Sequence, residues 1–445
     1  MSPHAWMITA PIVPTLTRLS APNIIVMVIA LATATAEAWY VGHHGTIALA
    51  GLALVFPMMM LTNMLSAGSI GGAVAGAVAQ RLGAADVEGA EALALHAVIV
   101  AVALSMVFTA IFLLGGTAIF SFLGAKGDVL AQAMTYSNIF FTGCLALWLC
   151  NTLGSIIRAT GNMTVSALTL GMASGVQILL GSVLILGLGD IQGMGIAGAA
   201  WATLIGFGAS ALVQIWYLTR RCKQMRLRFS GVPVEVRHFV SLLRVGFLAS
   251  VSPLSSVATV LVVTGLVARL GPEALAGYGI GARLEFLMIP IIFGIGAACI
   301  TLVGAHFGAG EVDRGHRVAW TGALGATLIT GGIGLVMAFF PQIWANLFSD
   351  VEAVRETCRA YLRIVGPCYA FFGLGLCLYF ASQGARKVLW PAMASLLRLG
   401  VTAAGGFIVV SYLEPTPGTL FSVIAIAMVT YGVMTAGAIR LGAWR

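Results

Sequence analysis

Long apolar stretches recur along the whole chain and constrain its fold more than any other feature. A helix crosses a bilayer core with about 20 apolar residues, and twelve stretches of at least that length alternate with polar segments. Membrane β-strands would instead alternate in hydrophobicity over about ten residues. The sequence therefore predicts an all-α integral membrane protein whose twelve transmembrane helices fall near 20–42, 47–78, 92–116, 130–157, 163–188, 194–219, 242–269, 274–306, 317–340, 355–384, 388–412 and 417–440.

The low content of charged residues supports the same fold class. Only 9% of the residues are charged, and the mean hydropathy is +1.01. A soluble domain averages about 25% charged residues because its surface faces water. A chain of 445 residues with so little charge cannot cover a water-facing globule.

The chain is also duplicated. Short matching segments recur in the same order about half a chain apart: 48–51 with 274–277 (both Ala-Leu-Ala-Gly), Gly83-Ala84 with Gly308-Ala309, and Tyr136 with Tyr361. Six spans precede the long polar connection from Arg220 to His238, and six follow it. We therefore predict two homologous lobes related by a pseudo-twofold axis along the membrane normal, an N-lobe of residues 1–228 and a C-lobe of residues 229–445.

The basic residues predict the orientation in the membrane. On one side of the predicted spans lie only Lys126, Arg269, Arg355 and Arg359, three arginines fall within spans, and all other Lys and Arg residues lie on the other side. Because basic loops stay in the cytoplasm, both termini are expected to be cytoplasmic and the protein to lie in the inner membrane of the cell. The basic cluster of residues 220–228 is expected to contact anionic lipid headgroups rather than nucleic acid.

Two acidic residues fall inside predicted spans away from their ends, Glu37 and Glu285. An ionised side chain at the centre of a bilayer costs about 2.5–3.5 kcal/mol on insertion scales, so such groups usually serve a function. Removal from water favours the neutral form of a carboxyl group, which suits a proton carrier. A structural ion pair elsewhere in the bundle is the alternative for Glu285. The second lobe has Val263 where the first has Glu37, and the first has Met59 where the second has Glu285.

The segment 37–45, Glu-Ala-Trp-Tyr-Val-Gly-His-His-Gly, resembles the first-helix signature of multidrug and toxic compound extrusion (MATE) transporters of the MOP superfamily, in which an Asp precedes a Val-Gly turn. Further segments resemble the family's loops and its sixth helix: Gly83-Ala84, Gly308-Ala309, 158–161 (Arg-Ala-Thr-Gly), 193–195 (Gly-Met-Gly) and 198–203 (Gly-Ala-Ala-Trp-Ala-Thr). No one motif is specific, but their order and duplication across nearly the whole chain make the resemblance strong.

This resemblance implies a V-shaped pair of six-helix lobes that exports bulky, often cationic compounds by alternating access, in exchange for H⁺ or Na⁺. The ion-coupling residues are expected to be Glu37, Gln177, Thr203 and Glu285. Ser256 stands where one branch of the family has a glutamate, and the tenth span contains no acid from Arg363 to Phe380. A single carboxyl group among polar neighbours suits proton binding better than sodium binding, although Na⁺ near Glu37 stays an alternative. No other metal ion and no cofactor are expected.

The aromatic residues of several spans suggest a substrate cavity between the lobes. Its expected lining is Trp39, Tyr40, Phe56, Tyr278, Phe286 and Phe371. Aromatic faces attract organic cations, so small organic, cationic compounds are the expected substrates. The alternative is that these rings face lipid or pack in the core.

Together these features predict a proton-coupled multidrug efflux antiporter that acts as a monomer. The alternative is a flippase for a lipid-linked or other amphiphilic anionic substrate, but such a protein needs a basic cavity, and only Arg283, Arg363 and Arg398 lie within predicted spans. An enzyme is not expected. The chain has no Asp-rich segment for Mg²⁺ on a diphosphate and no P-loop sequence for ATP.

Overall fold

The computed structural model describes residues 5–188, 191–231, 233–413 and 415–444, and 86% of it is helical. Asp190 and Glu414, which the sequence places in loops, and Arg445, expected on the cytoplasmic side, lie outside the described residues. In the first half of the chain the elements are α1 (Ala5–Thr9), α2 (Ile12–Gly42), α3 (Thr46–Asn63), the π-helical η1 (Met64–Ile70), α4 (Gly71–Gly83), α5 (Val87–Phe122), α6 (Gly127–Thr142), α7 (Leu145–Ala159), α8 (Met163–Leu186), β1 (Gly187–Leu188), β2 (Ile191–Gln192), α9 (Ile196–Trp216) and the π-helical η2 (Tyr217–Arg221).

The second half contains helices alone among its described residues. These are α10 (Val236–Ala268), α11 (Pro272–Gly308), α12 (Val312–Phe339), α13 (Gln342–Ala345), α14 (Glu352–Val365), the 3₁₀ turn η3 (Gly366–Cys368), α15 (Tyr369–Gly384), α16 (Leu389–Tyr412) and α17 (Pro417–Arg440). The two strands of the first half form only a two-residue antiparallel hairpin between α8 and α9.

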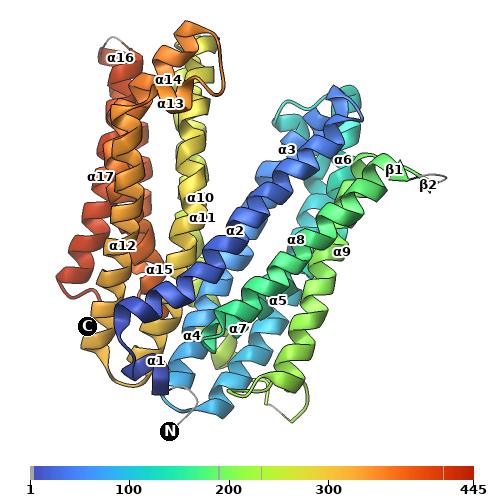
Figure 1. Cartoon of the computed structure of the whole chain (residues 1–445), viewed down its shortest axis with the longest axis vertical. Coiled ribbons are helices and arrows are strands. Elements are labelled where there is room, and N and C mark those ends of the chain that lie inside the picture. The colour runs from blue at the N-terminus through green and yellow to red at the C-terminus, as the bar shows by residue number, and fades with distance from the viewer. Residues whose placement is uncertain (1–4, 189–190, 232, 414, 445) are drawn as a thin grey trace.

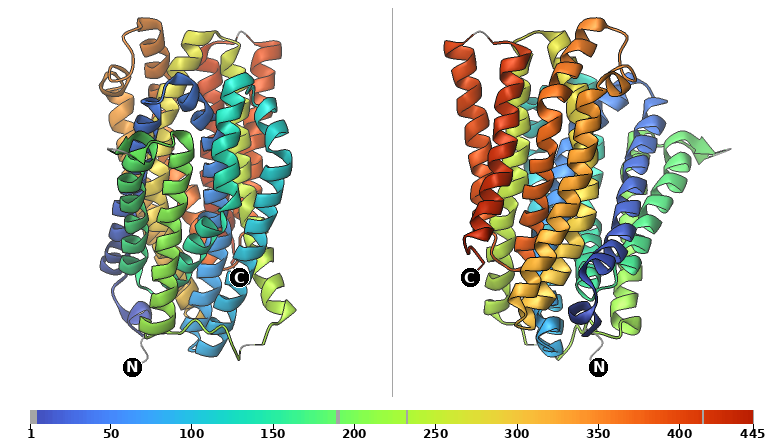
Figure 2. Two further views of the ribbon diagram at one scale, coloured as in Figure 1. Left: turned by 90° about the vertical axis from the view of Figure 1, so that its right-hand side faces the viewer. Right: turned by 60° about the vertical axis from the view of Figure 1, so that its left-hand side comes forward.

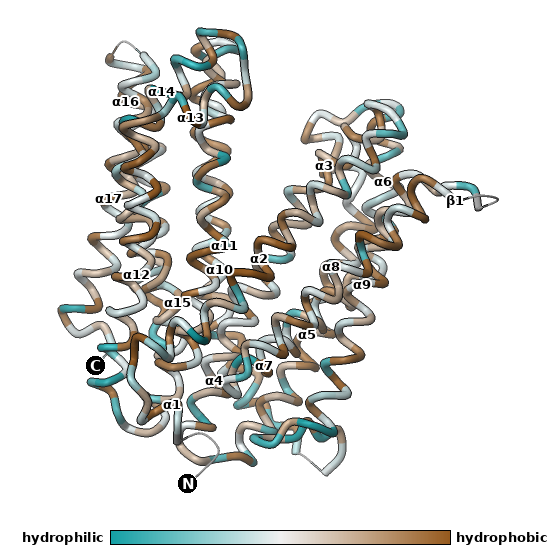
Figure 3. The backbone as a smooth tube through the Cα atoms, viewed as in Figure 1, coloured by the Kyte–Doolittle hydropathy of each residue, from teal (hydrophilic) through white to brown (hydrophobic). Residues whose placement is uncertain are grey.

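The described helices account for the predicted membrane spans. Eleven helices are long and apolar enough to cross a membrane, and α6 with α7, bent by 50°, makes a twelfth. Hydrophobic residues run along the middle of the helices, whereas hydrophilic residues gather in the loops at both ends (Figure 3). The chain is therefore a multi-pass membrane protein, as the apolar stretches predict.

The helices are longer than the predicted spans, because polar residues continue them beyond the apolar core. The third span, for example, was predicted over 92–116, but α5 runs from Val87 to Phe122. Asp86 begins this helix by accepting a hydrogen bond from the backbone N–H of Gly89, which satisfies one of the free donors of the first turn.

The helices form two groups that meet at one end and diverge at the other, which gives the expected V shape. In Figure 1, α2–α9 lean away from α10–α17 towards the top, and both chain termini lie towards the bottom. The right-hand view of Figure 2 shows the same separation. The lobe boundary at residues 228 and 229 stays a prediction.

At the closed end of the V, α4 and α11 cross with their backbones in contact. A β-carbon on Gly83 would clash with the carbonyl oxygen of Ala305, and one on Gly308 would clash with the carbonyl oxygen of Gln80. The two contacts relate the two halves symmetrically, because Gly83 and Gly308 are a matched pair of the duplication. Glycine is therefore required by this close approach, as in other tightly packed membrane helices.

The fourth predicted span is broken where α6 meets α7. A β-carbon at Gly143 would press against the side chain of Leu204, so the close packing of the neighbouring helix α9 favours glycine there. The hydroxyl of Thr109 donates to the carbonyl oxygen of Phe141 at 2.6 Å. Because a helical break inside a bilayer frees carbonyl groups that need a donor, this side chain from α5 stabilises the bend.

Candidate functional site

Glu37 lies near the end of α2, less than two turns before Gly42, and its carboxylate accepts hydrogen bonds from two neutral side chains. The hydroxyl of Tyr136 on α6 donates to Oε1 at 2.8 Å, and the amide Nε2 of Gln177 on α8 donates to Oε2 at 3.1 Å. Among the described residues no basic side chain forms an ion pair with Glu37. The carboxylate is therefore held by dipoles and not by a fixed positive charge.

Gln177 connects this carboxylate to Thr203 on α9. Its Nε2 lies 2.8 Å from Oγ1 of Thr203, and that hydroxyl donates to the backbone carbonyl of Ala199 at 3.0 Å. Four helices, α2, α6, α8 and α9, thus contribute to one hydrogen-bonded network. The structure brings together Glu37, Gln177 and Thr203, three of the four residues expected to couple ions.

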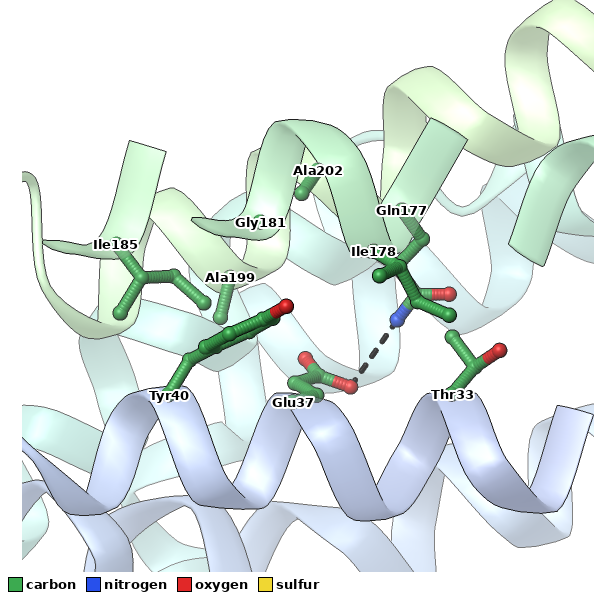
Figure 4. A pocket seen from close by; sticks show the side chains of 9 residues that line it. All are labelled: Thr33, Glu37, Tyr40, Gln177, Ile178, Gly181, Ile185, Ala199 and Ala202. Atoms are coloured by element: carbon green, nitrogen blue, oxygen red, sulfur yellow. Dashed lines mark hydrogen bonds between the residues drawn. The ribbon is translucent and has the colours of Figure 1, made fainter. Parts of the chain in front are cut away.

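A small pocket opens beside the carboxylate (Figure 4). It comprises about 190 Å³ of empty space, part of it open to the outside, and is lined by Thr33, Glu37, Tyr40, Gln177, Ile178, Gly181, Ile185, Ala199 and Ala202. The small residues of α8 and α9 leave this space free, and the carboxylate and the amide are its charged and strongly polar groups. Only about 10 Å³ of this space is accessible to the centre of a water molecule, about the room that one water needs, so this pocket fits a proton with water, or a small cation, but not a bulky organic compound.

Sequence reasoning missed Tyr136 as a member of the site. A signal was present, because Tyr136 is one of the positions that the duplication preserves, matched by Tyr361. A tyrosine kept in both halves of an otherwise apolar bundle indicates a hydrogen-bonded role, since a buried hydroxyl needs a partner. Both tyrosines are fully buried, and each donates to a glutamate.

The fourth expected residue, Glu285, lies in a separate cluster of the second half of the chain. Its Oε1 accepts a hydrogen bond from NH2 of Arg398 on α16 at 3.1 Å, and its Oε2 accepts one from the hydroxyl of Tyr361 on α14 at 3.3 Å. The guanidinium of Arg398 also lies 5.1 Å from the ring centre of Phe372. The structure therefore contains the ion pair that was the alternative interpretation of Glu285.

A second pocket occupies the place in this half that corresponds to the Glu37 pocket. It encloses about 200 Å³ and is lined by Val263, Leu266, Val267, Thr402, Gly406, Leu420, Val423 and Ile424. Val263 stands at the position that matches Glu37. The two pockets are similar in volume, but the second contains no ionisable side chain.

The aromatic residues expected to line a substrate cavity fall into different environments. Trp39, Phe56 and Phe286 are exposed, whereas Tyr40 lines the Glu37 pocket. Tyr278 is buried, with its ring centre 5.6 Å from that of Tyr361, and Phe371 is half-buried against Gly432. That the exposed rings line a substrate cavity and do not face lipid stays a prediction.

Among the described residues no three His, Cys, Asp or Glu side chains are grouped in a way that could hold a metal ion. The oxygen atoms around Glu37 come from one carboxylate, one amide and two hydroxyl groups. This donor set excludes a transition-metal centre of the usual nitrogen and sulfur type at this position.

Comparison with known proteins finds a family and relatives that match most of the chain. The sequence profile of the MatE family matches residues 22–183 and 249–408, which together cover well over half of the chain. A probable multidrug resistance protein NorM of Thermotoga maritima is 24% identical over 381 residues, 85% of this chain and 82% of that protein. An FAD transporter of Shewanella oneidensis is 22% identical over 424 residues, 95% of this chain and 93% of that protein.

Solved structures share the fold. The outward-facing conformation of a multidrug resistance MATE family transporter of the MOP superfamily superposes with a TM-score of 0.87 at 24% identity, covering 97% of this chain and 96% of that one. At this level of identity the likeness extends to the fold alone.

Proposed function

This chain belongs to the MatE family, whose members are transporters and not enzymes, and we propose that it exports small organic compounds in exchange for protons. The relatives named multidrug resistance proteins support an efflux function. The proposed location is the inner membrane of the cell with both termini in the cytoplasm, and the V then opens to the outside. Flat lipophilic cations are the proposed substrates, because exposed aromatic rings such as Trp39 and Phe56 attract them.

The observation that carries the proposal is the environment of the Glu37 carboxylate. Among the described residues it accepts hydrogen bonds from neutral groups alone, and its pocket has only about 10 Å³ accessible to the centre of a water molecule, which is too small for an organic substrate. A carboxylate without a fixed counter-charge is free to take up a proton. The organic substrate would therefore bind elsewhere, between the two groups of helices, while the coupling ion binds here.

Proton uptake would change the hydrogen bonds that tie α2 to its neighbours. In the ionised state both Tyr136 and Gln177 donate to Glu37. A protonated carboxyl group carries a donor of its own and needs an acceptor, so the amide of Gln177 would turn or the hydroxyl of Tyr136 would rotate. Because these groups lie on α8 and α6, loading and release of one proton would bias how α2 packs on the other helices.

Sodium coupling is the competing version of this function. Na⁺ binding needs several oxygen ligands, and the Gln177 nitrogen faces both Glu37 and Thr203 as assigned. Turning that amide would present its oxygen instead and complete a ligand set with Glu37 and Thr203. We favour protons because Glu37 is the one carboxylate among the described residues that line the pocket.

The test is export of ethidium from proteoliposomes that contain the purified protein, driven by an imposed pH gradient or an imposed Na⁺ gradient. A parallel sample carries a fluorescent anionic lipid, which would report a flippase. We expect ethidium movement with the pH gradient alone. Ethidium movement driven only by the Na⁺ gradient would show that Na⁺ is the coupling ion. Lipid movement without ethidium movement would contradict the proposed export function.

A further inference from the structure

Two tyrosines at matched positions of the duplication each hold one glutamate. Tyr136 donates to Glu37 at 2.8 Å, and Tyr361 donates to Glu285 at 3.3 Å. The glutamates come from different helices, α2 in the first half and α11 in the second. Each half of the chain therefore contains a tyrosine–carboxylate pair inside its helical bundle.

The two pairs differ in the group on the other side of the carboxylate. Beside Glu37 it is the neutral amide of Gln177, whereas beside Glu285 it is the guanidinium of Arg398. The side chains of Arg398 and Glu285 are 8% and 15% exposed, so the ion pair is largely shielded from solvent. Phe372 and Tyr431 lie against the guanidinium, with ring centres 5.1 and 6.0 Å away.

Among the described residues, Arg398 is the one basic side chain that pairs with Glu285, because Arg283, two residues earlier on α11, lies against Phe348 with its guanidinium 5.6 Å from the ring centre. Tyr278 on its own helix, Tyr361 on α14 and Tyr369 on α15 bring phenol groups close to the carboxylate. The charge balance of this cluster is therefore one carboxylate against one guanidinium.

The guanidinium of Arg398 is a fixed counter-charge beside the Glu285 carboxylate. The guanidinium group stays charged at all physiological pH values, and a buried charge that loses its partner is strongly unfavourable. Protonating Glu285, or binding a free cation there, would leave Arg398 without a counter-charge or add a second positive charge. Both outcomes oppose ion exchange at Glu285.

We infer that Arg398 is a fixed counter-cation that prevents ion exchange at Glu285, so that Glu37 alone exchanges protons. The inference rests on the proposed role of Glu37, and it adds a statement on stoichiometry, one coupling ion per transport cycle. Arg398 is thus a residue that determines ion specificity without contacting the substrate. Removing the Arg398 guanidinium should therefore allow ion exchange at Glu285 as well.

The test uses infrared spectroscopy of the purified full-length protein, which detects the C=O stretch of protonated carboxyl groups and does not depend on transport. Arg398→Met replaces the guanidinium with an apolar, adaptable side chain that suits an aromatic surrounding. We expect a new protonated-carboxyl band at neutral pH in Arg398→Met, and its loss in Arg398→Met/Glu285→Gln. Arg398→Lys keeps the positive charge and should lack the new band.

Two results would overturn the inference. One is a protonated-carboxyl band of the unmodified protein that Glu285→Gln removes. The other is the absence of a new band in an Arg398→Met protein that elutes as a folded species in size-exclusion chromatography. If Arg398→Met does not fold, the first measurement decides alone, because it needs only Glu285→Gln, and Arg398→Met is then not interpreted.

A transport measurement separates this inference from the proposed function. With ethidium as the probe, protons taken up per ethidium exported should rise about twofold in Arg398→Met relative to the unmodified protein. If Glu37→Gln still exports with a pH gradient, the proposed function fails, whereas the infrared result for Glu285 stands. If Glu285 titrates beside Arg398, the inference fails while the role of Glu37 stands.

Discussion

Glu37 and Glu285 each accept a hydrogen bond from one of the matched tyrosines, but they stand at unmatched positions of the two halves and their surroundings differ in charge. The first carboxylate faces an amide and a pocket of about 190 Å³, and the second faces a guanidinium and aromatic rings. The corresponding pocket of the second half has about the same volume, 200 Å³, with Val263 in place of the glutamate. Duplication preserved the helices, the pockets and the tyrosines, while single substitutions gave the halves different electrostatics.

This comparison teaches where to look for function in a duplicated membrane protein. A shared residue such as Tyr136 or Tyr361 marks a position that the fold needs in both halves. A difference at a matched position, such as Glu37 against Val263, marks a task that only one half performs. The following experiments would break or sharpen this division of roles.

The largest expected effect is the loss of pH-driven export in Glu37→Gln. The amide cannot exchange a proton, so ethidium export from proteoliposomes should stop while the protein still inserts and elutes as a folded species. Glu37→Asp is the matched control, because it keeps the carboxylate on a shorter arm and should retain export. Export by Glu37→Gln at the unmodified rate would mean that the first half does not couple ions.

Glu285→Gln should act on stability. Removing one partner of a buried ion pair leaves the other charge uncompensated, at a cost of about 3 kcal/mol. We expect a lower midpoint of thermal unfolding in detergent but an unchanged dependence of ethidium export on pH. Adding Arg398→Met should restore most of the stability. An altered pH dependence of ethidium export in Glu285→Gln would instead show that both halves take part in ion coupling.

Removing the hydroxyl of each matched tyrosine in turn should show which half sets the pH dependence of export. Tyr136→Phe takes one donor away from the Glu37 carboxylate, so the ionised form loses support. The pH at which ethidium export is half-maximal should then rise. Tyr361→Phe should leave that pH unchanged, because Arg398 still neutralises Glu285. Equal shifts in both variants would show that the tyrosines act through general packing.

The smallest expected effect concerns the matched loops after the second and eighth spans. Asp86 caps α5, whereas Glu311, at the start of α12, forms no such capping hydrogen bond. The Gly89 N–H, with a smaller contribution from Arg81, holds the pKa of Asp86 below its ordinary value. Asp86→Ala should therefore cost about 1 kcal/mol of stability at neutral pH, and Glu311→Ala should cost much less.

The pH dependence of that difference provides its own check. A carboxyl group with a lowered pKa in the folded state stabilises the fold above its unfolded pKa, and this contribution is lost as the pH falls below about 4. Thermal unfolding of the Asp86→Ala variant and the unmodified protein should therefore converge in acid. A difference in midpoint that persists there would point to lost packing instead.

The sequence predicts the spans and the fold class well because the length of a span is set by the bilayer, and the V shape follows from the family resemblance. The helix ends are less accurate, since polar first turns such as that of α5 remain helical beyond the apolar core. The break at Gly143 was not predicted either. It depends on contact with Leu204, a residue of another helix, which no local pattern records.

The site was predictable in part. Glu37 stands out as an acid inside a span, and Gln177 and Thr203 follow from the resemblance to MATE transporters, but their role in coupling stays a prediction. The partner of Glu285 could not be found from local sequence, because Arg398 lies 113 residues further along the chain on another helix. The burial of Tyr278 likewise depends on tertiary packing against Tyr361.

The glycine contacts at Gly83 and Gly308 have a mechanical consequence for the whole molecule. The continuous span Thr46–Gly83 has 38 residues, so its far end lies about 57 Å along the helix from this crossing. A tilt of only about 10° at the crossing would carry that end sideways by about 10 Å. Because the two backbones touch at one end of these helices, a small rotation at the contact would produce a much larger displacement at the open end of the V.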